Sequence, residues 1–331
     1  MQARKYSERL GVIEPAQLNA VAEQFDLGVI IDARPAVGGL FGQNVMLETT
    51  EGWYVFRGNP HGPGQLTKER RVADLINAQS SLPAPWPYRV CDDPGLFGWT
   101  YAVMPMLPGV CGQDLWSTAD AASRQELATS CGRSLAMLHE VTGATCRAYD
   151  EQIDDFVPVD GAFTAWWLSR LDETRNRCRQ VGALSAQAER FIDDLVERNL
   201  PALDDSFTPV LVHHDFKAGN LNFLPVGASF EPSGVFDLFE AYFADPEEDL
   251  VRMLWTVDTD DERRAFIAGY TDTALLRDGA ADRLELYALA DWLLAWEYGK
   301  RNRIWFEDVT FADSVRPILA AARAVGSWSR R

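Results

Sequence analysis

The sequence predicts an α+β fold in two lobes, a small β-rich lobe in residues 1–108 and a large, mostly helical lobe in residues 109–331. Three observations support this prediction. Short apolar runs separated by glycine-rich turns follow one another between residues 27 and 57, which is typical of strands. Beyond residue 126, apolar residues recur at helical spacing over most of the chain. With 331 residues, 47% of them hydrophobic, the chain is long enough to bury a core in each lobe.

The first lobe is expected to begin with a helix and to continue in strands. Residues 4–24 mix charged and apolar residues at helical spacing, which predicts an N-terminal helical cap. Strands are expected at residues 27–31, 44–49 and 53–57. A helix that carries Glu69 follows, because the segment L-T-K-E-R-R-V-A-D-L-I repeats its apolar residues at helical spacing.

The second lobe is expected to be helical on both sides of a strand hairpin. The predicted helices span residues 126–141, 163–181, 186–200, 251–257, 261–274, 282–301 and 314–325. Between the third and fourth of these helices, short apolar strands are expected at residues 210–212, 221–224 and 235–237.

The loop after residue 212 brings polar side chains together. It contains His213, His214, Asp215, Lys217 and Asn220. If the two following strands pair as a hairpin, Asn220 lies at the same end of it as Asp237. Amide and carboxylate oxygens are the ligands that Mg²⁺ prefers, and Mg²⁺ commonly keeps phosphate as a further partner. The sequence therefore predicts phosphoryl transfer. A transition-metal site at the two histidines and Asp215 is the alternative.

The motif H-x-D-x-x-x-x-N, followed by an aspartate on the next hairpin and then by D-P-E-E-D-L, resembles the aminoglycoside phosphotransferase family. This family is the small-molecule branch of the protein-kinase-like superfamily and is related to choline and macrolide kinases. The resemblance implies a protein-kinase-like bilobal fold and a kinase that uses ATP or GTP. It implies that Asp215 is catalytic, that Lys217 reaches the transferring phosphoryl group, and that Asn220 and Asp237 bind Mg²⁺. His214 departs from the pattern, because glycine is frequent there.

The resemblance also implies phosphate-binding residues in the first lobe. The glycines of the turn, Gly38, Gly39 and Gly42, would let backbone N–H groups approach a phosphate, although such loops are often only tight turns. Arg57 stands where kinases carry the lysine that holds the α- and β-phosphates. Its expected partner is Glu69, and the alternative is a surface arginine.

The segment W-T-Y-A-V-M-P-M-L-P-G, residues 99–109, resembles the hinge of this family. In that reading Met104 backs the adenine, the Pro105 carbonyl accepts from the adenine amino group, and the Leu107 N–H donates to a ring nitrogen. Proline fits because its missing N–H is not required. The alternative is an ordinary edge strand that ends in a proline turn.

The acceptor is expected to be a small cationic molecule, such as an aminoglycoside antibiotic, an amino sugar or an amino alcohol. The net charge is -18, of which residues 1–108 contribute only -2, so the acidity lies in the acceptor lobe. Candidate acceptor residues are Glu240, Asp291, Trp292, Trp296 and Glu297. A neutral sugar or macrolide acceptor, or an inactive nucleotide-binding module, are the alternatives. The negative charge disfavours a nucleic-acid partner.

Cysteine usage and hydropathy predict a cytoplasmic protein. The five cysteines are scattered and form no C-x-x-C pair, which favours free thiols in a reducing compartment. No apolar run is long enough for a membrane helix or a signal peptide. We expect a monomer or homodimer with no membrane partner.

Overall fold

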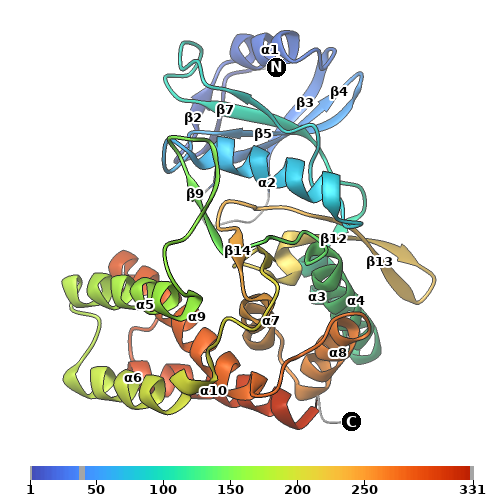
Figure 1. Ribbon diagram of the computed structural model, residues 1–331. Coiled ribbons are helices and arrows are strands. Elements are labelled where there is room, and N and C mark those ends of the chain that lie inside the picture. Colours follow the sequence, from blue (N-terminus) through green and yellow to red (C-terminus); the bar gives the residue numbers. More distant parts are fainter. Residues whose placement is uncertain (1, 37–41, 329–331) are drawn as a thin grey trace. The chain divides into compact units, whose positions relative to one another are not determined.

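In the computed structural model, which describes residues 2–36 and 42–328, the chain divides into two units (Figure 1). The first unit comprises Met1–Gly109, Tyr149–Asp155 and Ser233–Phe239, and the second comprises Val110–Ala148, Phe156–Pro232 and Glu240–Arg331. The sequence predicts one division after residue 108. Two short segments from later in the chain therefore join the first unit in addition to the expected residues.

A five-stranded antiparallel sheet organises the first unit. Its strand order is β3 (Ile30–Pro35), β4 (Asn44–Thr49), β5 (Gly52–Gly58), β7 (Tyr101–Pro105) and β6 (Arg89–Cys91). In β4 every second side chain is buried, as expected for a strand with one face on the core. Gly52 closes the turn between β4 and β5 with φ of +136°, a conformation that glycine adopts without strain.

Two helices pack on this sheet. Helix α1 (Pro15–Gln24) buries Leu18 and Val21 completely, and both belong to the core that includes the sheet. Helix α2 (Gln65–Gln79) runs beside the sheet in Figure 1 and contacts β6. Its buried face includes the charged residue Glu69 among apolar neighbours.

The beginning of the chain corrects the prediction of a helix over residues 4–24. Residues 4–13 form a hairpin in which β1 (Arg4–Ser7) pairs antiparallel with β2 (Gly11–Ile13), and α1 starts only at Pro15. Gly11 has φ of +67°, a left-handed conformation that a right-handed helix excludes. Proline then favours the first position of a helix because its φ is already fixed. The helical spacing before Pro15 was therefore incidental.

Helix α9 (Ala280–Asn302) is the central helix of the second unit. It contacts four others, α5 (Phe163–Gln180), α6 (Ala186–Asn199), α7 (Leu250–Thr256) and α10 (Phe311–Trp328), which Figure 1 shows around it. Its Leu284, Leu289 and Leu293 are fully buried. The predicted helices of this unit are present, with shifted ends.

Helices α4 (Ala121–Leu138) and α8 (Asp260–Thr271) cross at two glycines. A Cβ atom on Gly132 would lie 2.1 Å from the carbonyl oxygen of Phe266, and one on Gly269 would lie 2.1 Å from the carbonyl oxygen of Thr129. Because real Cβ atoms do not approach backbone so closely, only glycine permits this crossing.

Two small sheets contain the strands on either side of residues 213–220. One has the order β10 (Asp155–Pro158), β9 (Arg147–Asp150), β14 (Tyr242–Ala244) and β11 (Val210–Val212), and the other has the order β13 (Ser229–Val235), β12 (Leu221–Val226) and β8 (Val110–Cys111). Short helices α3 (Gly112–Thr118), η1 (Leu200–Ala202), η2 (Ala218–Asn220) and η3 (Pro246–Asp249) connect these elements. The strand expected at residues 235–237 ends earlier than predicted. Asp237 lies beyond β13 with φ of +63°.

All five cysteines are free thiols. Four of them, Cys91, Cys131, Cys146 and Cys178, are buried, and Cys111 is half-buried. Burial raises the pKa of the thiols at 111, 131, 146 and 178. The thiolate form is therefore scarce at neutral pH in these four residues.

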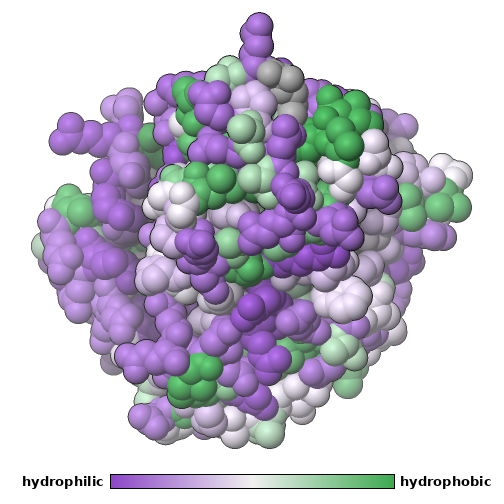
Figure 2. Space-filling model, turned by 90° about the horizontal axis from the view of Figure 1, so that it is seen from above, coloured by the Kyte–Doolittle hydropathy of each residue, from purple (hydrophilic) through white to green (hydrophobic). Residues whose placement is uncertain are grey.

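The surface in Figure 2 is mostly hydrophilic, and its hydrophobic side chains form separate patches. Exposed large hydrophobic residues include Val12, Val29 and Ile31 near the start of the chain. Among the described helices, none combines the length and the apolar character needed to cross a membrane.

Candidate active site

Residues 213–220, here called the polar loop, connect β11 to β12 and are anchored by Asp249. The two carboxylate oxygens of Asp249 accept hydrogen bonds from the backbone N–H groups of His213 and His214, both at 2.6 Å. The ring of His139, a buried residue, lies 3.3 Å from the same carboxylate. The last aspartate of D-P-E-E-D-L therefore fixes the backbone that presents the loop, and His139 is a hydrogen-bonded core residue.

Asp215 is surrounded by cations within the second unit. Its Oδ2 accepts from Lys217 Nζ at 2.7 Å and from Asn220 Nδ2 at 3.0 Å, and Arg252 Nε lies 3.5 Å from its Oδ1. Burial alone raises the pKa of Asp215, but the charges of Arg252 and Lys217 outweigh it and lower the pKa overall. Oδ1 is buried and accepts no hydrogen bond from the described residues.

Asn220 is oriented by Asp215. Its Nδ2 also donates to the backbone oxygen of Asp215 at 2.8 Å, so both N–H groups of the amide are engaged on that side. The amide oxygen therefore points away from Asp215, and an oxygen of this kind fits Mg²⁺. Asp237, the other predicted ligand, belongs to the first unit, where its side chain is 38% exposed.

Arg57 is buried at the end of β5 and is not a surface residue. Its Nη2 donates to Glu69 Oε1 at 2.7 Å, which is the pairing expected from the sequence, and to Asp237 Oδ1 at 3.1 Å. Burial alone lowers the pKa of Arg57, but Glu69 and Asp237 outweigh it and raise the pKa overall. Tyr88 donates to Glu69 Oε2 at 2.7 Å. The first unit thus places a permanent cation beside Asp237.

The predicted glycine turn is described only in part. Gly38 and Gly39 lie outside the described residues. Gly42 has φ of +54°, and its carbonyl oxygen accepts a hydrogen bond from Ser7 Oγ. Glycine is favoured at Gly42 because a side chain in this left-handed conformation would be strained.

The three predicted hinge residues lie at the end of β7 and just beyond it. Met104 pairs with Val55 across the sheet and is buried, and Pro105 is the last residue of the strand. Leu107 is also buried, and its side chain packs on Gly234, where a Cβ atom would lie 2.6 Å from Leu107 Cδ1. The roles of these residues towards adenine stay predictions.

The predicted acceptor residues have different environments. Asp291 is buried and accepts from Arg252 Nη2 at 2.5 Å and from Trp255 Nε1 at 2.7 Å. Trp292 donates to Ser314, Trp296 stacks on Phe306, Glu297 pairs with Arg301, and Glu240 is exposed. Asp291 is linked to Asp215 through Arg252. The acceptor role of all five stays a prediction.

Sequence reasoning missed Arg252, Arg170 and Tyr242, which lie close to the polar loop, and it gave no separate role to Glu248 of the D-P-E-E-D-L motif. Arg252 follows Asp249 by three residues on α7, a helical spacing that could have suggested a side chain on the same face. Arg170 donates to Tyr242 Oη at 2.6 Å and lies 3.5 Å from Glu248 Oε2. No spacing in the sequence predicts the contacts of Arg170 with Tyr242 and Glu248, because these residues are far from Arg170 in the chain.

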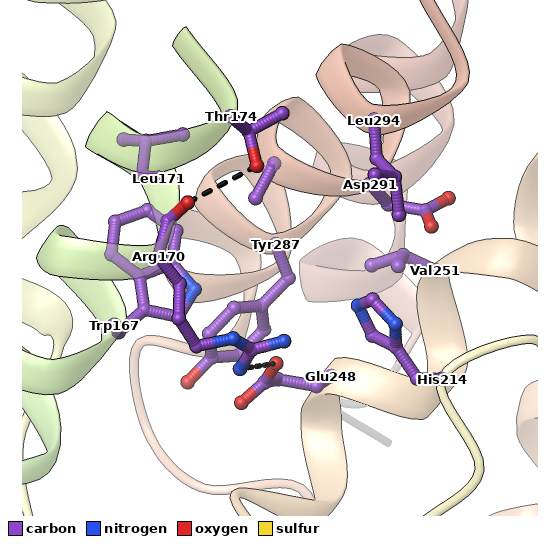
Figure 3. A pocket seen from close by; sticks show the side chains of 11 residues that line it. Trp167, Arg170, Leu171, Thr174, His214, Glu248, Val251, Tyr287, Asp291 and Leu294 are labelled. Carbon is purple, nitrogen blue, oxygen red and sulfur yellow. Dashed lines mark hydrogen bonds and ion pairs between the residues drawn. The ribbon is translucent and has the colours of Figure 1, made fainter. Parts of the chain in front are cut away.

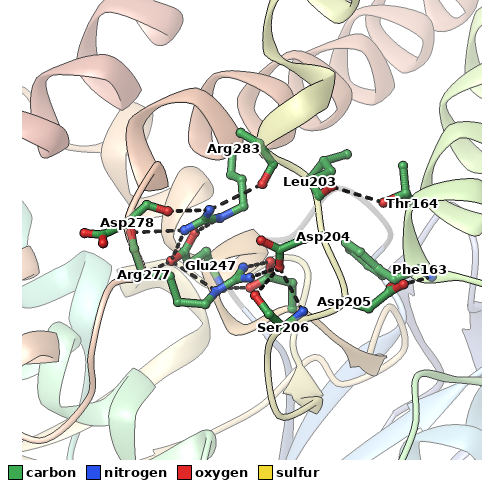
Figure 4. A network of polar contacts seen from close by, with 12 residues as sticks. Phe163, Thr164, Leu203, Asp204, Asp205, Ser206, Glu247, Arg277, Asp278 and Arg283 are labelled. Carbon is green, nitrogen blue, oxygen red and sulfur yellow. Dashed lines mark hydrogen bonds and ion pairs between the residues drawn. The ribbon is translucent and has the colours of Figure 1, made fainter.

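The acids of D-P-E-E-D-L are buried and paired, as Figure 4 shows for Glu247 with Arg277 and Arg283. Arg283 donates to both oxygens of Glu247, at 2.7 and 3.0 Å. Asp245 accepts from Arg277 and from Tyr287. Buried carboxylates without such partners would be strongly destabilising. The segment is therefore a structural anchor as well as a recognisable motif.

The transition-metal alternative finds no support in the described residues. No group of three or more His, Cys, Asp or Glu side chains in residues 2–36 and 42–328 is placed to hold one ion.

Comparison with known proteins places these features in one family. The model of the APH family, described as the phosphotransferase enzyme family, matches residues 32–307. No curated protein matches the chain.

Among solved structures, the chain is similar to a mutant of aminoglycoside 2'-phosphotransferase-IIIa in complex with GDP, with a TM-score of 0.64 and 18% identity, covering 95% of this chain and 99% of that one. It is similar to aminoglycoside phosphotransferase APH(4)-Ia, with a TM-score of 0.64 and 16% identity, covering 96% and 99%. It is also similar to the GDP and kanamycin complex of APH(2")-IIIa, with a TM-score of 0.63 and 18% identity, covering 94% and 99%.

At these identities the solved structures establish the fold, and the predicted α+β, protein-kinase-like fold is confirmed. The family model spans most of the chain, including the polar loop, Asp237 and the D-P-E-E-D-L segment. The chain therefore belongs to the phosphotransferase enzyme family.

Proposed function

We propose that this chain transfers the γ-phosphoryl group of a magnesium nucleotide, ATP or GTP, to a hydroxyl group of a small molecule. The observation that carries the proposal is the environment of Asp215. Its Oδ2 is held by Lys217 and Asn220, while Oδ1 is buried and has no hydrogen-bond donor among the described residues. Such an oxygen suits the hydroxyl of an acceptor.

In this mechanism the acceptor oxygen bonds to the γ-phosphorus as the bond to the β,γ-bridging oxygen breaks, and the nucleoside diphosphate leaves. Asp215 orients the hydroxyl and takes its proton, and Lys217 offsets the charge of the transferring group. Asn220 and Asp237 would hold Mg²⁺, which neutralises phosphate charge when bound. Arg57 would contact the α- and β-phosphates with its planar fork.

The acceptor class has two candidates. A cationic acceptor is favoured by the acidity of residues 109–331, whose net charge is -16, and by the kanamycin in the complex of APH(2")-IIIa. A neutral acceptor is favoured by the pairing of Asp291 with Arg252 and of Glu248 with Arg170, which leaves the charge beside Asp215 nearly balanced. The free thiols are consistent with a cytoplasmic enzyme.

Substitution of Asp215 and Asp237 tests the mechanism. With acceptor saturating, Asp215→Asn should lower kcat by about 10² to 10⁴-fold, because the proton acceptor is lost. Asp237→Ala should chiefly raise the KM for the magnesium nucleotide. The measurement is release of ADP or GDP with panels of sugars, amino sugars, amino alcohols and macrolides.

The exposed residue Asp160 provides a matched control, because Asp160→Asn makes the same chemical change away from the polar loop. Circular dichroism checks that each variant is folded. A kcat near the wild-type value in Asp215→Asn, or an unchanged nucleotide KM in Asp237→Ala, would rule out the proposed mechanism.

A further inference from the structure

A pocket in the second unit lies beside the polar loop (Figure 3). Its walls come from α5, α7, α9, η3 and the polar loop. They include Trp167, Arg170, His214, Glu248, Tyr287 and Asp291. His214 precedes the catalytic candidate directly, and Arg252 connects Asp291 to Asp215. A molecule in this pocket would therefore be held next to the reacting group.

One carboxylate oxygen in the pocket has no hydrogen-bond partner within the described part of the chain. Glu248 Oε2 accepts from Tyr242 Oη at 2.6 Å and lies 3.5 Å from Arg170 Nη1. Glu248 Oε1 is buried and accepts no hydrogen bond from the described residues, and the side chain is 5% exposed. A buried acceptor that is left unsatisfied costs about 1–3 kcal/mol. The site is therefore built to receive a hydrogen-bond donor from a ligand.

The charges around this oxygen decide which donor fits. Figure 3 shows the guanidinium of Arg170 next to the Glu248 carboxylate. The second acid of the pocket, Asp291, is already engaged by Arg252 and Trp255. An ammonium group would meet Arg170 at close range with no additional carboxylate to compensate it. A hydroxyl donates the same hydrogen bond without that repulsion.

The remaining walls suit a carbohydrate ring. Trp167 and Tyr287 supply aromatic surface, and Leu171, Val251 and Leu294 supply apolar surface. Burial raises the pKa of Glu248 to about 7, against the opposing effects of Arg170 and Tyr242. At neutral pH the carboxyl group can thus both accept and donate a hydrogen bond, as a hydroxyl-bearing ligand requires.

We propose that this pocket is an acceptor subsite for an uncharged polyhydroxylated ring, in which a ring hydroxyl donates to Glu248 Oε1. The inference rests on the proposed phosphotransferase function and gives it a substrate class, a neutral sugar or polyol. Glu248 and Arg170 act here as specificity-determining residues, and Asp215 keeps the chemical step.

The test combines matched acceptors with a pocket-filling variant. The probes are D-glucose, D-ribose and myo-inositol, each compared with an amino-deoxy counterpart at a pH below the pKa of the amine. Ala290 lines the pocket on α9, so Ala290→Leu should fill it, whereas Ala320→Leu makes the same change on the exposed side of α10. We expect a neutral probe to have a kcat/KM at least about tenfold above its amino counterpart. Ala290→Leu, unlike Ala320→Leu, should raise its KM at least about tenfold and leave the nucleotide KM unchanged.

Deoxy analogues of the best neutral probe test the role of Glu248 separately from any effect on folding. Removing the hydroxyl that Glu248 binds should reduce kcat/KM in the wild type by about the same factor as Glu248→Gln does with the full probe. In Glu248→Gln the same deoxy analogue should cause little further loss. Independent, multiplying losses for every deoxy position would overturn the assignment of Glu248.

The outcomes separate this inference from the proposed function. Preference for the amino probes, or an unchanged acceptor KM in Ala290→Leu, overturns the inference while Asp215-dependent transfer leaves the proposed function standing. If no probe is phosphorylated and Asp215→Asn releases ADP as fast as the wild type, the proposed function fails. Saturation-transfer NMR without nucleotide then tests whether the pocket binds a neutral probe. Binding that Ala290→Leu abolishes supports the inference, and absence of binding overturns it.

Discussion

Arg57 uses two nitrogens of its guanidinium group at once, and this geometry distinguishes it from the lysine that kinases commonly carry. Its Nη2 lies 2.7 Å from Glu69 and 3.1 Å from Asp237, and its Nη1 lies 3.4 Å from Asn44 Oδ1. A lysine has one ammonium group and no fork, so it could not reproduce all these contacts at once. The residue therefore joins packing in the first unit to a potential phosphate contact.

Arg57→Lys should raise the nucleotide KM, because the planar fork is lost. Arg57→Met should raise it further and should destabilise the fold by about 3–5 kcal/mol, because Glu69 is left buried without its cation. Nucleotide kinetics and urea unfolding measure the two effects.

The double variant Arg57→Met/Glu69→Gln provides the control for Arg57. It should recover much of the stability, since the unpaired buried charge is gone, and it should keep the raised nucleotide KM. A nucleotide KM at the wild-type value in Arg57→Met would assign this arginine to folding alone.

At the level of elements, the crossing of α4 and α8 depends on two glycines, Gly132 and Gly269, which have no side chain. Gly269→Ala should destabilise the protein by about 1–3 kcal/mol or more, because the new Cβ atom would meet the Thr129 carbonyl oxygen and force the helices apart. Gly62→Ala is the control, since a Cβ atom at Gly62 meets no atom within 4 Å. Thermal or urea unfolding measures both variants, and equal stability of the two would contradict the role of the crossing.

The presence of the helices in the second unit was predicted correctly, because their apolar residues repeat over several turns. α5, α6 and α9 lie where the periodicity places them, whereas the ends of α4 and α10 are set by caps and packing that periodicity does not encode. The hairpin of β1 and β2 was predicted wrongly as a helix, because a few apolar residues at matching intervals satisfy either period. Strands β9, β10 and β14, which are three or four residues long, were missed.

The site was predictable where its residues are close in sequence. Asp215, Lys217 and Asn220 lie within six positions, and the structure brings them into direct contact. The pairing of Arg57 with Glu69 was also expected, because the resemblance to the family implies it. The contacts of Arg170 and Arg252 join distant segments, and only the packing of α5, α7 and α9 creates them.

For the whole molecule, the uneven distribution of charge affects how acceptors arrive. Residues 1–108 have a net charge of -2, and the remaining residues have -16. A field of this kind speeds the encounter with cations and is screened by salt within about 10 Å at 0.1 M ionic strength. It acts at a distance, so it is separate from the balanced charges inside the pocket.

Raising the ionic strength from a low value to about 0.5 M should therefore lower kcat/KM for an amino acceptor more than for its neutral counterpart. The neutral acceptor corrects for effects of salt on nucleotide binding, because both reactions share that step. Initial rates at subsaturating acceptor give the two values. Identical salt dependence of both acceptors would show that the acidic surface does not steer them.

The burial of the cysteines determines how the protein can be labelled. Four of the five thiols are buried, and the half-buried Cys111 has a raised pKa, so maleimide reagents, which react with the nucleophilic thiolate, should modify the native chain slowly. A single cysteine introduced at an exposed position, such as Leu275, which is 88% exposed, should react much faster. A fluorophore or spin label can thus be attached at a chosen residue without first removing the native cysteines, and spectroscopy of nucleotide and acceptor binding can use the otherwise unaltered enzyme.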